Sequence, residues 1–168
     1  MEKELTSAQI KYYMHQALFE AQNAEAIGEV PIGAIVVCHG KIIGRGHNLR
    51  EHGQDATLHA EMLAITEACE TQHSWRLPDA QLFVTLEPCP MCSGAIINSR
   101  IAEVYYGASD PKAGTAGTLM NLLTDSRFNH QAKVVSGVCE DEAAQLLHKF
   151  FRSIRKQRKL KKRHLTNK

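Results

Sequence analysis

The sequence predicts an α/β fold of three layers, α/β/α, built on one mixed sheet of about five strands. Short apolar runs alternate with segments of helical periodicity along most of the chain. Only two residues separate the first two apolar runs, which indicates an antiparallel hairpin. The later runs are connected through helical segments, as parallel strands require.

The first helix is expected to begin at Thr6, because Thr6 and Gln9 have the spacing of a capping box. Apolar residues at helical spacing follow: Ile10, Tyr13, Met14, Ala17, Leu18 and Ala21. Gly28 is expected to cap the C-terminal end of this helix. The runs GAIVVC and KIIGRG then flank His39-Gly40, a pair that favours a tight hairpin turn.

A polar loop over residues 47–57 leads to a second expected helix over residues 59–70. The positions in it that are able to face inward are Met62, Leu63, Ile65 and Cys69. The apolar run QLFVTL, residues 81–86, is short enough for a buried strand. The segment CPMCSGAIINSR, residues 89–100, is expected to be helical, because Pro90 suits a first-turn position where its missing N–H costs nothing.

The last part of the chain supplies two further strands and a final helix. IAEVYYGA at residues 101–108 and AKVVSGV at residues 132–138 have the composition of strands. Residues 141–160 have helical periodicity. Their apolar positions are Leu146, Leu147, Phe150, Phe151 and Ile154.

Composition is that of an ordinary globular protein. Of 168 residues, 43% are hydrophobic and 23% are charged, which is enough for one domain with a proper core. The N-terminal stretch has no apolar region of a signal peptide, and no apolar run approaches membrane-spanning length. We therefore expect a cytoplasmic chain without membrane contact. Five cysteines, an odd number, argue against a disulfide framework.

Charge is distributed unevenly along the chain. Residues 152–168 carry nine Lys and Arg and no Asp or Glu, whereas residues 1–151 carry eleven basic and eighteen acidic residues. We expect a single domain over residues 1–152 and a basic helix end or tail over residues 153–168. This tail is either simply solvated or in contact with the phosphate backbone of a nucleic acid.

The segment TLEPCPMC, residues 85–92, holds Cys89 and Cys92 three positions apart at the start of an expected helix. Both sulfurs can point at one ion, because residues i and i+3 share a helix face. A helix N-terminus also favours the thiolate form that binds metals. The sequence contains no second pair of this kind. By itself the pair fits a redox dithiol, part of a metal site, or coincidence.

His59 and Glu61 stand at the start of the preceding expected helix, which should lie at the same end of the sheet. His59, Cys89 and Cys92 then supply three ligands for one zinc ion per subunit and leave a fourth position for water, the pattern of a catalytic site. Zinc lowers the pKa of such a water toward ~7. Glu61 is placed to take up a proton from that water and to pass it to a leaving group.

The pattern H-A-E followed by P-C-x-x-C resembles the signature of the zinc-dependent nucleoside and nucleobase deaminases, and implies a cytidine-deaminase-like fold. The resemblance covers residues 30–152. Further segments are similar to the bacterial tRNA-specific adenosine deaminases: EVPIGAIVV, GHN, TLEPCPMCSGAI, GASDPKAGTAG, FNH and FFR. This resemblance implies hydrolytic conversion of adenosine to inosine at the wobble position of tRNA, by a homodimer that binds the anticodon stem-loop.

The same resemblance implies a set of substrate-binding residues. Asn48 is similar to the side chain that hydrogen-bonds the target base, although it also suits a turn after Gly46. The others are Val30 and Pro31 in the pocket wall, Asp110 and Lys112 beside the anticodon, Asn129 and His130 in a second RNA-facing loop, and Phe150 and Arg152 in the last helix. Asp110 before a proline also fits ordinary turn chemistry. Since Phe150 and Phe151 are adjacent, one is expected to pack inside and the other to meet a partner.

Two other hypotheses fit part of these observations. A deaminase of a free base or nucleotide, such as guanine or a cytosine derivative, would use the same zinc ligands. A non-catalytic, zinc-containing RNA-binding subunit would lack the proton-transfer group, and the presence of Glu61 argues against it.

Overall fold

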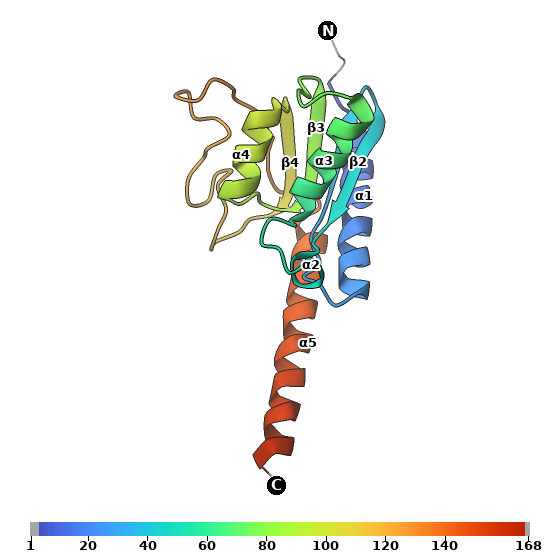
Figure 1. Ribbon diagram of the computed structural model, residues 1–168, viewed down its shortest axis with the longest axis vertical. Coiled ribbons are helices and arrows are strands. Elements are labelled where there is room, and N and C mark those ends of the chain that lie inside the picture. Colours follow the sequence, from blue (N-terminus) through green and yellow to red (C-terminus); the bar gives the residue numbers. More distant parts are fainter. Residues whose placement is uncertain (1–3, 167–168) are drawn as a thin grey trace.

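The computed structural model describes residues 4–166 and has the predicted three layers (Figure 1). Its five strands are β1 (Gly33–Cys38), β2 (Lys41–His47), β3 (Ala80–Leu86), β4 (Glu103–Ala108) and β5 (Lys133–Val135). They form one sheet in the order β2-β1-β3-β4-β5. Strand β1 pairs antiparallel with β2 and with β3, while β3-β4 and β4-β5 pair in parallel. The prediction of a mixed sheet is confirmed.

Helices cover both faces of this sheet. Helices α1 (Ser7–Ala26) and α5 (Glu140–Thr166) pack on one face, and α3 (Ala60–Gln72) and α4 (Pro90–Ser99) pack on the other. Alternate residues of β1 serve the two layers, since Ile35 joins the apolar cluster under α1 and Val36 joins the cluster under α3 and α4. Burial on both faces explains why the central strands are continuously apolar.

The predicted turns and caps are present. The Thr6 hydroxyl accepts a hydrogen bond from the N–H of Gln9 at 3.3 Å, and the Thr6 N–H donates to the Gln9 side chain at 2.9 Å. Gly28 follows α1 with φ of 81°, a left-handed conformation that glycine adopts without strain. His39 and Gly40 both have positive φ, as a two-residue hairpin turn with the twist of the flanking strands requires.

Helix α3 packs unusually close to β2. A Cβ atom on Gly44 would lie 2.1 Å from the carbonyl oxygen of Ala64, and one on Gly46 would lie 2.3 Å from that of Ala60. The side of α3 that faces the sheet is therefore built from small residues. Of the positions judged able to face inward, Ile65 is buried, whereas Met62, Leu63 and Cys69 are only half-buried. This close contact fixes the start of α3 relative to the sheet.

Three segments differ from the sequence-based expectation. The chain between β4 and β5, residues 109–132, contains no helix although the two strands pair in parallel, because a crossover of this length can span the sheet without one. The polar loop after β2 contains a one-turn helix, α2 (Arg50–Gly53). Helix α5 is longer than predicted and extends well past the body of the molecule (Figure 1). It passes position 152, the expected end of the domain, without a break. In residues 4–166, no helix combines the length and apolarity needed to cross a bilayer.

Candidate active site

His59, Cys89 and Cys92 lie together at the starts of α3 and α4. His59 is the N-cap residue of α3 and Cys89 that of α4, with Cys92 one turn further along α4. The Nδ1 atom of His59 lies 3.6 Å from Sγ of Cys89 and 3.5 Å from Sγ of Cys92. Tetrahedral bonds of about 2.0 Å to nitrogen and about 2.3 Å to sulfur separate such atoms by about 3.5 Å. The three side chains therefore fit a zinc ion as they stand.

The strand directions explain why the two helix starts meet. Strands β2 and β3 are both antiparallel to β1, so they run in the same direction. Helix α3 follows the carboxyl end of β2, and α4 follows the carboxyl end of β3. Pro90 occupies the first turn of α4, which holds Cys89 just outside the helix. The expectation that both helices begin at one end of the sheet is confirmed.

The thiols of Cys89 and Cys92 shift each other's pKa in opposite directions. A hydrogen bond with Cys92 lowers the pKa of Cys89 to about 4, and the same contact raises the pKa of Cys92. The hydrogen bond with Cys89 also raises the pKa of His59. Since thiol and imidazole ligands bind metals in their deprotonated forms, binding of an ion at this position would release the protons that these groups carry.

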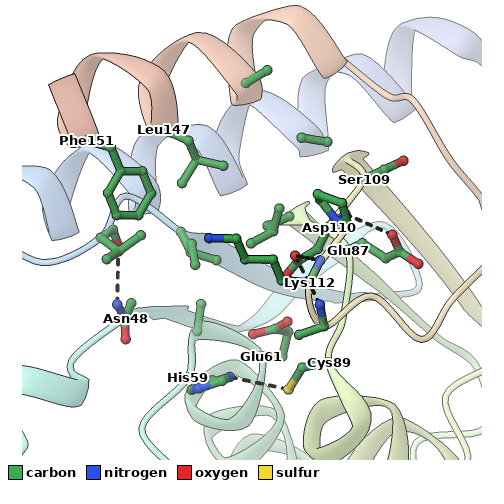
Figure 2. Close-up of a pocket in the computed structure, with 18 of the residues that line it drawn as sticks. Asn48, His59, Glu61, Glu87, Cys89, Ser109, Asp110, Lys112, Leu147 and Phe151 are labelled. Carbon is green, nitrogen blue, oxygen red and sulfur yellow. Dashed lines mark hydrogen bonds between the residues drawn. The ribbon is translucent and has the colours of Figure 1, made fainter. Parts of the chain in front are cut away.

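Glu61 lies in the first turn of α3 and is buried beside His59, Cys89 and Cys92. Figure 2 shows its carboxyl group next to His59 and Cys89. Burial is the main cause that raises the pKa of this carboxyl to about 7. A carboxyl group with such a pKa can both accept and return a proton at neutral pH. The geometry thus gives Glu61 the properties of a general acid and base.

A cavity of about 620 Å³ opens above Glu61. It brings together these predicted site residues: Val30, Asn48, His59, Glu61, Cys89, Asp110 and Lys112. Cys92 is buried beneath them. Figure 2 shows Leu147 and Phe151 of α5 on the opposite side of the cavity. The volume is in the range of pockets that enclose a small organic ligand such as a nucleobase.

Glu87, between β3 and Cys89, lines the cavity and binds the loop that forms one of its walls. The sequence did not indicate this role. Its buried carboxylate accepts hydrogen bonds from the N–H groups of Asp110, Ala116 and Thr118, each at 3.0 Å, and from the Thr118 hydroxyl. Burial by itself would raise the pKa of Glu87, but these hydrogen bonds outweigh it and lower the pKa. The loop after β4 is therefore anchored to the turn that carries Cys89.

Comparison with known proteins agrees with this geometry. The family model of the MafB19-like deaminases matches residues 8–155. The tRNA-specific adenosine deaminase of Bacillus subtilis is 56% identical over 158 residues, which cover 94% of this chain and 98% of that protein. The chain belongs to the tRNA-specific adenosine deaminase family. It is therefore a deaminase.

Solved structures support membership of this family. One, from biochemical and structural studies of A-to-I editing by tRNA:A34 deaminases at the wobble position, has a TM-score of 0.78 and 43% identity, and covers 81% of this chain and 99% of its own. A guanine deaminase from Bacillus subtilis has a TM-score of 0.59 and 37% identity, and the match covers 64% of this chain and 69% of the guanine deaminase. Both have the cytidine-deaminase-like fold expected from the sequence, and the tRNA deaminase matches more of the chain.

Asn48 lies in the cavity wall, and its side chain already makes two hydrogen bonds. Its side-chain oxygen accepts from the N–H of Arg50 at 3.2 Å, and its amide group donates to the carbonyl of Val30 at 3.4 Å. An asparagine amide can make two further hydrogen bonds. Hydrogen-bonding capacity thus remains for a base, and the predicted contact stays a prediction. Asp110 likewise serves a turn, because its Oδ1 accepts from the N–H groups of Lys112 and Ala113.

Other predicted RNA-binding residues of the chain do not line the cavity. These are Pro31, Asn129, His130, Phe150 and Arg152. Pro31 is buried, and the Nε2 of His130 is 2.7 Å from the Ile101 carbonyl oxygen, a contact that anchors the loop of His130. Asn129 and Arg152 are exposed. Their predicted contacts with RNA stay predictions.

Helix α5 supplies cavity residues that the sequence did not distinguish. Ala144, Leu147, His148 and Phe151 line the cavity, at the spacing i, i+3, i+4 and i+7 of one helix face. Phe151, rather than the adjacent Phe150, points into the cavity. Arg50 of α2 also lines it. The helical spacing was visible in the sequence, but nothing there indicated which face of the helix meets the site.

Proposed function

We propose that this chain converts adenosine to inosine at the wobble position of tRNA, with one zinc ion held by His59, Cys89 and Cys92. The observation that supports it most is the placement of Glu61 beside three side chains with zinc-ligand geometry, at the floor of a cavity sized for a base. When bound, zinc would act as a Lewis acid that lowers the pKa of water at the site.

The residues of the chain then carry the proton transfers and orient the base. Water adds to the amino-bearing carbon of adenine, and Glu61 accepts the proton that the water loses. Glu61 returns this proton to the departing amino group, which leaves as ammonia, so that adenosine and water give inosine and ammonia. Asn48 orients the base by hydrogen bonds from the wall, while Leu147 and Phe151 cover it from α5 and exclude water.

The proposed partner is the anticodon stem-loop of a tRNA. A loop nucleotide can be turned out of its stack into a pocket at low cost, whereas a base within a stem cannot be reached. Arg50, Lys112 and His148 lie around the cavity, where cationic or hydrogen-bonding groups would meet phosphate. The predicted contacts of Asp110, Asn129, His130, Phe150 and Arg152 with neighbouring nucleotides belong to the same proposal, as does action in the cytoplasm.

We also propose that residues 1–152 act as the deaminase domain of a homodimer. Large apolar side chains are exposed in the segment between β4 and β5: Leu119, Met120 and Phe128. Apolar side chains gathered on one exposed segment are typical of a protein contact surface. Sedimentation of the full chain should give the mass of a dimer, and a monomer that retains full activity would contradict this part of the proposal.

A substrate panel tests the activity. The zinc-loaded protein would be incubated with an anticodon stem-loop that carries a wobble adenosine, and separately with free adenosine, guanine and cytidine. We expect inosine in the RNA and no turnover of the small molecules. Xanthine formed from guanine, with no inosine in the RNA, would instead identify a free-base deaminase.

A further inference from the structure

The part of α5 beyond the cavity forms a positively charged rod. Four residues of α5, Ala144, Leu147, His148 and Phe151, line the cavity, and the helix then continues out of the body of the molecule (Figure 1). An ion pair between Lys149 and Glu25 of α1, at 3.7 Å, links α5 to the body just before this extension. Residues 152–163 are therefore within reach of a nucleic acid strand that leaves the cavity on the side of α5.

The charge of this extension is high and of one sign. Its eight cationic residues, all exposed, are Arg152, Arg155, Lys156, Arg158, Lys159, Lys161, Lys162 and Arg163. The sequence has no Asp or Glu after Glu142. At about 1.5 Å per residue these charges span roughly 16 Å, or about one per 2 Å. Double-stranded DNA, for comparison, carries one negative charge per about 1.7 Å, so the linear charge density of the extension is of the same order as that of a nucleic acid and opposite in sign.

Cations at this spacing destabilise the helix unless an anion lies against them. Like charges at i and i+4, such as Arg152 with Lys156 and Arg155 with Lys159, repel each other. The rest of the chain cannot attract RNA by net charge, because residues 1–151 carry eleven basic and eighteen acidic residues. The extension is thus the part of the molecule with an overall attraction for phosphate.

The apolar residues of the extension do not favour a membrane or a helical partner. Within residues 152–163 only Ile154 and Leu160 are apolar. They are six positions apart in the chain, which puts them on different sides of the helix, about 240° apart. An interfacial helix needs a continuous apolar face, and a coiled coil needs an apolar residue about every 3.5 positions. Residues 152–163 have neither pattern. Their cationic surface therefore favours a ligand that carries phosphate groups.

We infer that residues 152–163 bind the phosphate backbone of the same RNA whose base enters the cavity. The inference rests on the proposed function for the identity of the RNA. It deepens that function by adding a second contact surface outside the active site. Such a surface supplies affinity that depends on salt and is independent of the base in the cavity.

The test uses the full-length, zinc-loaded protein and an anticodon stem-loop. Arg155, Lys156, Arg158 and Lys159 are replaced together by glutamine, which maintains helix propensity. A matched control exchanges Arg for Lys and Lys for Arg at the same four positions. The dissociation constant is measured over a series of salt concentrations. Each lost phosphate contact should reduce the magnitude of the slope of log K against log salt by about 0.7 to 0.9, so loss of all four contacts in the glutamine variant should reduce it by about 2.8 to 3.6.

The control variant should keep the slope of the wild type, and zinc content and turnover at saturating RNA should be equal in all three proteins. Equal slopes for wild type and glutamine variant would overturn the inference. Charge-dependent binding to vesicles containing anionic lipid, with RNA slopes unchanged, would overturn it in favour of a membrane. A wild type that makes no inosine would contradict the proposed function alone, because the slopes are read from binding.

Discussion

Replacement of Glu87 by glutamine should loosen the loop that carries Asp110 and Lys112 without removing a zinc ligand. Glutamine has the same shape, and its oxygen can still accept from the N–H groups of Ala116 and Thr118. Its amide group would instead face the N–H of Asp110 and the Thr118 hydroxyl, which donate to the carboxylate in the native protein. The hydroxyl can turn and accept, but the Asp110 N–H cannot.

The size of this effect follows from the hydrogen bonds that are lost. A buried N–H without an acceptor costs about 1–3 kcal/mol, and the remaining bonds lose the strengthening that a charged acceptor provides. We expect a total of about 2–4 kcal/mol in the free energy of unfolding. For a chain of this length each kcal/mol lowers Tm by about 2–4 °C, so Tm should fall by roughly 4–16 °C.

Thermal unfolding followed by circular dichroism measures this shift, with zinc content determined on the same sample. Thr118→Val is the matched control, because it removes only the hydroxyl donor and should cost about 1 kcal/mol. The KM for the stem-loop should rise more than kcat falls, since the loop contributes to binding. An unchanged Tm together with an unchanged KM for Glu87→Gln would refute the anchoring role.

Three further predictions concern other parts of the site. Glu61→Gln should keep zinc and fold but lower kcat by about 10²–10⁴, measured as inosine formed; full activity would exclude Glu61 as the proton carrier. Phe151→Ala should lower kcat/KM for the stem-loop by tenfold or more and Phe150→Ala by less, because Phe151 lines the cavity; the reverse order would contradict this placement. Glu29, buried, accepts two hydrogen bonds from His52, which outweigh burial and lower the pKa of Glu29. The stabilisation that ionised Glu29 provides is therefore complete above its unfolded pKa of about 4.3 and is lost as the pH falls through the lower folded pKa. Wild type should have a higher Tm than Glu29→Gln at pH 7, and this difference should disappear in acid.

The cluster of His59, Cys89 and Cys92 with Glu61 could be predicted from the sequence because the proposed chemistry depends on short spacings. Cys89 and Cys92 are three positions apart, and His59 stands two positions before Glu61 at a helix start. Strand length and turn residues also indicated the mixed sheet. These signals are local, and the layered fold then brings both helix starts to the same end of the sheet.

Val30, Asn48, Asp110 and Lys112 of the cavity wall were predicted, but the contributions of α5 and Glu87 could not be, because they depend on long-range packing. Whether Phe150 or Phe151 faces the site depends on how α5 is rotated against the sheet, where the buried Ala143 packs in the cluster under α1. Glu87 stood within the most informative segment, yet its role requires contact with a loop more than twenty residues later in the chain. Packing of α3 on Gly44 and Gly46 was equally invisible, since it depends on the pairing of helix and strand.

Zinc titration into metal-free protein, with inosine formation in the anticodon stem-loop measured at each step, tests the central claim most directly. The proposed site predicts that activity rises in proportion to bound zinc, reaches its maximum at one zinc per subunit, and appears only at the wobble adenosine. Activity that does not depend on zinc, or a zinc-saturated protein that leaves the wobble adenosine unchanged, would contradict the account.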